Sequence, residues 1–147
     1  MTQPMESESS FTREELARRR RVWSAWSDLF LDTELQAAEH CGIARQLRES
    51  GYTDAQLLRI LKDEVAPVCG PNLLSVAGEW AGFDEDRLAT RIQGHLAAGP
   101  FSRWLARSGM TPVLLMVRKD REAVMGALAR LRLAQLGHPE QETGERG

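Results

Sequence analysis

The sequence predicts an all-α protein, a compact bundle of five to seven helices with a central elbow punctuated by proline and glycine. Apolar residues recur at helical spacing along most of the chain, and capping residues precede several of these stretches. The length of 147 residues suits one domain that buries its own core. We place this domain at residues 11–137, between polar tails at residues 1–10 and 138–147 that we expect to be disordered.

The first predicted helix spans residues 12–32 and has a strong start signal. Thr12 and Glu15 match the capping box, in which each side chain accepts a hydrogen bond from the other residue's backbone N–H. The helix then presents a broad apolar face made of Leu16, Val22, Trp23, Trp26, Leu29 and Phe30.

Two further helices follow with similar signals. Thr33 and Gln36 predict a second capping box, and Gly51 is a natural residue at which that helix ends. Thr53 caps a third helix. We expect Pro67 to stop the third helix, because proline lacks the N–H that an interior helical residue donates.

Residues 64–86 are predicted to form a buried elbow, because apolar side chains share this stretch with residues that turn the backbone. Within the elbow we expect a brief helix over residues 71–77 and a corner at Trp80. Asp84 then caps the next helix. The neighbouring acids lie in its first turn, where the helix dipole favours negative charge.

The C-terminal part predicts a helix over residues 84–99, a short one over residues 100–109 and a long one over residues 111–136. The short helix contains Phe101, Trp104 and Leu105. Residues 113–117 also fit a buried strand, but no second run offers that strand a partner. The predicted core consists of Trp23, Trp26, Phe30, Ile43, Leu47, Ile60, Leu61, Leu73, Leu74, Leu88 and Ile92.

Charge is segregated along the chain although the formal net charge is only -2. Residues 34–86 carry four basic and ten acidic side chains, whereas residues 87–137 carry nine basic and two acidic ones. Either the two segments face each other in the fold, where their fields partly cancel, or they form a dipolar surface that steers a charged partner.

Several classes of protein are disfavoured by what the sequence lacks. It has no apolar run of the roughly 20 residues that a membrane helix needs, and its N-terminus does not resemble a signal peptide, so we expect a cytoplasmic protein. Cys41 and Cys69 are two lone thiols without clustered histidines, so we expect neither a disulfide nor a bound metal. No phosphate loop, nucleophile elbow or other cofactor motif occurs, and we expect no cofactor.

Two features that suggest chemistry have structural interpretations that we favour. Arg18 to Arg21 resemble a nucleic-acid patch, but consecutive helical residues lie about 100° apart and scatter around the helix. His40 resembles a base or a ligand, but no productive partner stands near it in the sequence, so we expect a surface histidine.

Three stretches of the chain resemble a known family. They are RRVWSAWSDLFLDTE, GYTDAQLLRILKDEVAPV and NLLSVAGEWAGFDED, and together they cover roughly residues 16–95. The family is a group of small bacterial helical proteins catalogued as a domain of unknown function. The resemblance implies a bacterial, stand-alone helical domain; it supplies no catalytic residues, and it leaves the segment from Pro100 onward unassigned.

The leading functional hypothesis is a non-catalytic protein–protein interaction module, such as an immunity protein that blocks a toxin or an adaptor that holds an effector. The predicted partner-binding residues are one aromatic anchor ringed by carboxylates, a set that suits a basic cleft: Glu79, Trp80, Asp84, Glu85 and Asp86. A homo-oligomer stays open. A second hypothesis is a small enzyme whose candidate acids are Glu64, Glu79 and Asp84. A third is a nucleic-acid regulator that uses the basic residues between Arg87 and Arg132.

Overall fold

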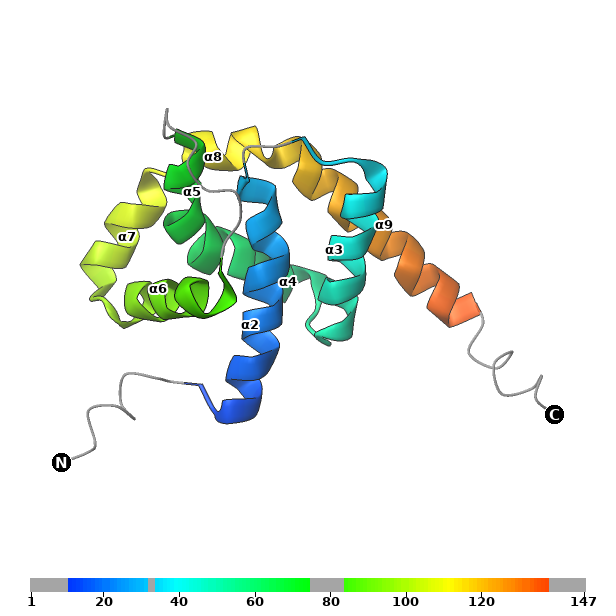
Figure 1. Cartoon of the computed structure of the whole chain (residues 1–147), viewed down its shortest axis with the longest axis horizontal. Coiled ribbons are helices and arrows are strands. Elements are labelled where there is room, and N and C mark those ends of the chain that lie inside the picture. Colours follow the sequence, from blue (N-terminus) through cyan, green and yellow to red (C-terminus); the bar gives the residue numbers. More distant parts are fainter. Residues whose placement is uncertain (1–10, 32–33, 75–83, 138–147) are drawn as a thin grey trace.

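A computed structural model describes residues 11–31, 34–74 and 84–137, and every element in these ranges is helical (Figure 1). The all-α prediction is confirmed. The elements in chain order are α2 (Arg13–Ser27), the 3-10 turn η1 (Asp28–Phe30), α3 (Ala37–Glu49), α4 (Asp54–Ile60), the π-helical turn η2 (Leu61–Val65), α5 (Ala66–Leu74), α6 (Glu85–Ala97), α7 (Pro100–Ser108), α8 (Thr111–Met116) and α9 (Arg118–Gly137). Both predicted tails lie outside the described residues.

Helix α2 runs through the middle of the bundle and contacts α3, α4, η2 and α6 (Figure 1). In this view α6 and α7 lie on one side of α2, and α3 and α9 lie on the other. Helix α9 packs along α3, and α5 packs on α8. The elements from the C-terminal part of the chain therefore cover the N-terminal ones on both sides.

The core prediction is confirmed wherever the structure describes the side chain. Nine predicted residues are buried: Trp23, Trp26, Phe30, Ile43, Leu47, Ile60, Leu61, Leu88 and Ile92. The side chains of Leu73 and Leu74 lie outside the described part of the chain. Helices α8 and α9 and the residue between them add Val113, Val117, Val124 and Leu128 to this core.

The caps at the starts of the first three helices differ from the prediction in detail. Thr12 caps α2 by accepting from the Glu15 backbone N–H at 3.0 Å, but the Glu15 carboxylate accepts from Arg19 and Tyr52 instead of completing the predicted capping box. Thr53 and Gln56 form a complete capping box at α4. Helix α3 begins later than predicted, with Gln36 as its N-cap and Glu39 as the reciprocal partner. Thr33 lies outside the described residues.

The expectation that Pro67 stops the third helix is wrong, because the chain stays helical from α4 through Pro67 to Leu74. In η2 the backbone widens, and the Ala66 N–H bonds the Leu61 carbonyl five residues earlier. Proline cannot donate to the Asp63 carbonyl four residues earlier. That oxygen instead lies 3.2 Å from His95 Nε2 on α6, which donates to it in the Nε2–H tautomer.

The elbow prediction is therefore wrong for residues 64–74, which are helical. The brief helix expected over residues 71–77 begins at Ala66 instead and has Pro71 in its interior. Residues 75–83 lie outside the described part of the chain.

The long helix predicted over residues 111–136 is broken at Val117, and residues 113–117 do not form a strand. Val113 and Val117 are both buried. Helix α8 packs on α5, whereas α9 packs on α3. One straight helix cannot follow both neighbours, so the direction changes between the two segments.

Replacing Trp26 by alanine tests the core. Trp26 is fully buried, and its Nε1–H donates to the Leu57 carbonyl at 2.9 Å. We expect Trp26→Ala to lower the free energy of unfolding by about 3–5 kcal/mol in urea denaturation. The matched control is Trp104→Ala on exposed α7, for which we expect less than about 1 kcal/mol. Equal losses would contradict the assigned burial.

Replacing Gly70 by alanine tests the close contact between α5 and α8. A Cβ atom at Gly70 would lie 2.7 Å from Met110 Sδ and 3.0 Å from Val113 Cγ1. We expect Gly70→Ala to destabilise the fold by about 1–3 kcal/mol because the core is overpacked. Gly94→Ala in α6 is the control, since nothing lies within 4 Å of its Cβ position, and we expect it to stabilise by about 0.5–1 kcal/mol.

Candidate functional site

The predicted acidic corner is described only in part. Asp84 caps α6, and its Oδ2 accepts from the Arg87 backbone N–H at 3.0 Å. Glu85 Oε2 lies 3.8 Å from Arg20 Nε on α2, and Asp86 pairs with the same guanidinium. Each of the three acids thus has a structural role, and Asp86 stays largely exposed in its pair.

Glu79 and Trp80, the other two residues of that predicted site, lie outside the described residues. The interpretation of the corner as a binding patch for a basic cleft therefore stays a prediction.

The candidate acid Glu64 is buried in η2, where its carboxylate joins α2 to the π-helical turn. Arg19 donates to both oxygens, from Nε at 3.2 Å and from Nη2 at 3.1 Å. The Trp23 indole donates to Oε1 at 2.7 Å. Such a carboxylate, with a two-pronged arginine and an indole donor, is held as a structural anion.

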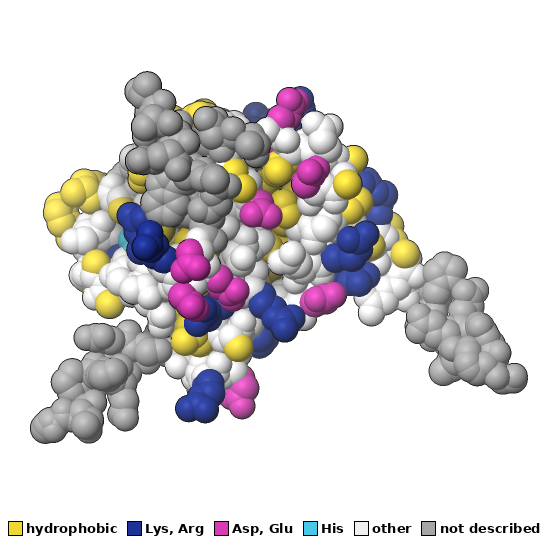
Figure 2. Space-filling model, viewed as in Figure 1, with side chains coloured by type: hydrophobic (Ala, Val, Ile, Leu, Met, Phe, Trp, Pro, Cys, Tyr) yellow, Lys and Arg dark blue, Asp and Glu magenta, His cyan; other side chains and the backbone are white. Residues whose placement is uncertain are grey.

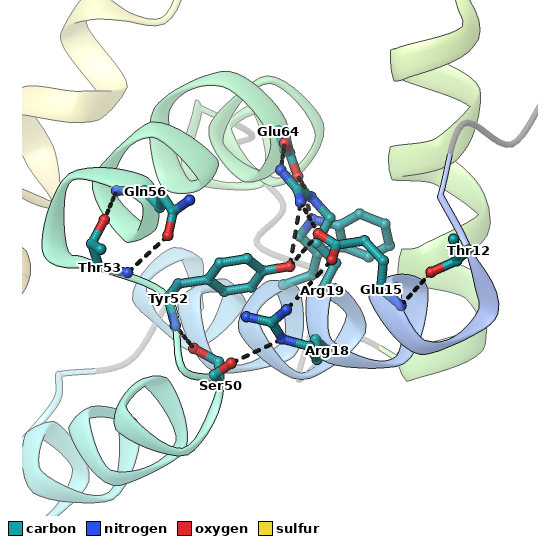
Figure 3. A network of polar contacts seen from close by, with 10 residues as sticks. Thr12, Glu15, Arg18, Arg19, Ser50, Tyr52, Thr53, Gln56 and Glu64 are labelled. Atoms are coloured by element: carbon teal, nitrogen blue, oxygen red, sulfur yellow. Dashed lines mark hydrogen bonds and ion pairs between the residues drawn. The ribbon is translucent and has the colours of Figure 1, made fainter.

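The same network continues from Arg19 to Glu15 and Tyr52 (Figure 3). The Tyr52 hydroxyl donates to Glu15 Oε2 at 2.6 Å, and Arg19 Nη1 donates to that oxygen at 2.6 Å. The hydrogen bond from Tyr52, followed by the attraction of Arg19, holds the pKa of Glu15 below its usual value against the opposing effect of burial. Burial and the bond to Glu15 raise the pKa of Tyr52.

Three of the four consecutive arginines are engaged inside the fold. Arg18 donates to the Ser50 carbonyl at 3.0 Å and lies over the Tyr52 ring, Arg19 binds Glu64, and Arg20 pairs with Glu85 and Asp86. The fourth, Arg21, is exposed and has no hydrogen bond or ion pair with the residues that the structure describes. The run does not form one patch for nucleic acid.

The expectation of a surface position for His40 is wrong. Its side chain is largely buried between α3 and α9, and its Nε2 lies 2.9 Å from Asp120 Oδ1. The partner stands 80 residues away, so no local motif could reveal it.

Helix α7 carries the largest exposed aromatic side chains of the described residues. Phe101, Trp104 and Leu105 are 70%, 54% and 56% exposed, and the rings of Phe101 and Trp104 stack with centroids 5.9 Å apart. Figure 2 shows hydrophobic side chains at the left edge of the molecule, over α7, with Lys and Arg side chains beside them. We call Phe101, Trp104 and Leu105 the apolar face of α7.

Polar contacts hold α7 to the body from its other side. Arg103 Nη1 donates to the Leu96 carbonyl at 3.0 Å, and Arg107 Nε lies 3.8 Å from Asp63 Oδ1. The helix has no buried residue. Helix α7 thus reverses the usual orientation of a surface helix, since its charged side chains face the protein and its apolar ones face solvent. The sequence predicted the helix but not this orientation.

Metal ligands and thiols are two further kinds of group that carry chemistry in proteins. The described residues contain no group of three His, Cys, Asp or Glu side chains that could hold a metal ion. Burial raises the pKa of the Cys69 thiol to about 12, which keeps it protonated and unreactive. No helix in the described ranges is both long and apolar enough to cross a membrane.

Replacing Tyr52 by phenylalanine tests the network through its pH dependence. Glu15 with a lowered pKa contributes stability above the ordinary glutamate pKa, and the contribution is lost as the pH falls through the lowered value. We therefore expect Tyr52→Phe to lower the free energy of unfolding at pH 7, and the difference from the parent to shrink in acid.

The measurement is urea denaturation between pH 7 and pH 3. Thr53→Ala is the control, because it removes a cap bond worth about 1 kcal/mol that involves no titrating group. A Tyr52→Phe deficit that stays constant with pH would contradict the assigned role of the hydroxyl.

Comparison with known proteins places the chain in a family. No curated protein matches the chain, and neither does any solved structure. A model of the family described as "Domain of unknown function (DUF7079)" matches residues 17–127. The match extends beyond roughly residue 95, where the resemblance noted in the sequence ended, and it includes α7 and α8. The chain belongs to this family of domains of unknown function.

Proposed function

We propose that this chain is a non-catalytic protein-binding module, a bacterial immunity or adaptor protein of the cytoplasm, and that α7 is its contact element. One observation carries the proposal: the three largest apolar side chains of α7 are exposed to solvent while the arginines of the same helix contact the body of the protein. Exposed apolar groups of this size are typical of surfaces that another molecule covers.

The chemistry of the apolar face supports this role. Tryptophan and other aromatic side chains supply a large share of the binding energy at protein interfaces. The stacked rings of Phe101 and Trp104 also restrict each other, so less rotamer entropy is lost on binding. Because α7 is tied to Leu96 and Asp63, the face is presented on a fixed support.

The two alternative functions have less support in the described residues. General acid–base catalysis needs carboxylates that can reach a substrate. Glu64 is buried and bound by Arg19 and Trp23, and Asp84 caps a helix. A nucleic-acid regulator needs a surface of available cations. Among the basic residues between Arg87 and Arg132, four pair with carboxylates of this chain: Arg107, Arg118, Arg121 and Arg132.

A photo-cross-linking amino acid at Leu105, in cells of the native host, tests the proposal. We expect a protein adduct from position 105 and none from the control position Gln135, which is exposed on α9 at the other side of the molecule. The adduct identifies the partner for binding measurements in vitro.

Trp104→Ala is then expected to weaken binding of the purified partner at least about tenfold without loss of folding. The acidic corner supplies the comparison, as Glu85→Lys with Asp86→Lys. If only the acidic-corner variant lost binding, the contact surface would be the acidic corner and not α7. Equal binding by all variants would exclude both surfaces.

A further inference from the structure

All charged residues in the sequence around α7 are basic. Residues 87–119 contain six basic side chains and not one acid: Arg87, Arg91, Arg103, Arg107, Arg118 and Lys119. Two of the six lie on α7 itself, directly behind the apolar face. The helix that presents the aromatic side chains therefore carries positive charge and no negative charge of its own.

The positive charge on α7 is only partly compensated in the described part of the chain. Arg103 donates to a backbone carbonyl, which leaves its full charge in place. Arg107 faces Asp63 at 3.8 Å, and both side chains of this pair are partly exposed. The field acts on neighbouring groups: burial, followed by the nearby charges of Arg103 and Arg107, lowers the pKa of His95.

A second copy of the chain is a poor occupant of the apolar face. A two-fold contact through α7 would place the positive helices of both copies against each other. The area is also small. Three exposed side chains offer on the order of 350 Å², whereas a stable interface between two flat surfaces takes about 800 Å² from each partner.

A groove that wraps around the helix removes this limit on area. Helix-in-groove recognition needs only a few anchors at spacings of three and four residues, because the walls of the groove cover the flanks of the helix as well. Phe101, Trp104 and Leu105 have these spacings on the nine residues of α7. Arg103 and Arg107 face the body of the protein but stay partly exposed, so their charge acts on the rim of a groove that covers the flanks of the helix.

We propose that α7 inserts its apolar face into an apolar groove of a partner protein whose rim carries aspartate and glutamate. The inference rests on the proposed function and adds the chemistry of the partner. An anionic lipid surface is the competing occupant. It fits less well, because a flat surface would touch the outermost side chains without reaching the two arginines turned toward the body of the protein.

Three substitutions of Ser102 test the sign of the charge on the rim of the partner's groove. Ser102 is exposed at the third position of α7, next to the apolar face. With the protein captured at position 105 as the probe, we expect Ser102→Lys to raise the association rate and Ser102→Glu to lower it. Each change should be roughly two- to fivefold at low salt and disappear at high salt. Ser102→Gln is the neutral control.

The design separates charge recognition from helix stability. An acid in the first turn of a helix stabilises that helix and a lysine destabilises it, so an effect acting through α7 stability would give the opposite order. Equal rates, or faster association of Ser102→Glu, overturn the acidic rim but leave the proposed function in place if the adduct at position 105 is a protein.

The second arm of the experiment is sedimentation of the parent with vesicles of phosphatidylcholine containing phosphatidylglycerol. Absence of a protein adduct at position 105 overturns both the inference and the proposed function. Vesicle binding that Trp104→Ala abolishes would then assign the apolar face to a lipid surface.

Discussion

The buried carboxylate of Glu64 is the interaction on which the arrangement of this fold depends. A carboxylate in the interior is costly unless charged or polar donors satisfy it, and removing one partner leaves the other buried and unpaired. Arg19 and Trp23 supply these donors from adjacent turns of α2. These bonds fix both the rotation of α2 about its axis and its position along that axis relative to η2. Its neighbouring arginines then reach Ser50 on one side and the start of α6 on the other.

The sequence was sufficient for features determined by local pattern. The helical periodicity of apolar residues identified the buried faces that contain Trp23, Ile43, Ile60 and Ile92. Apolar residues that recur at helical spacing lie on one side of a helix, and that side packs into the core. The caps at Thr12, Thr53 and Asp84 were also readable, since each involves residues three apart.

Features that depend on residues far apart in the sequence could not be predicted from it. Pro67 cannot donate to the Asp63 carbonyl, and the side chain that approaches this oxygen, His95, stands 28 positions later in the sequence. His40 likewise contacts Asp120 across the α3–α9 contact. The exposed position of Phe101 was missed for a related reason. An apolar stripe on a helix has the same spacing whether it faces a core or solvent, and only the contacts of Arg103 and Arg107 decide between them.

In most helices the apolar face both attracts other apolar groups and holds the helix to its own protein. Helix α7 is held by its polar side, so its apolar face is not needed for that attachment. In α2 or α6 a substitution on the apolar face changes the packing of the protein itself. In α7 no residue is buried, and both bounding glycines, Gly99 and Gly109, have open space around them. The outward residues of α7 can therefore be exchanged with little effect on folding. Substitutions on that face change the surface of the molecule and leave the packing of the rest of the bundle as it is.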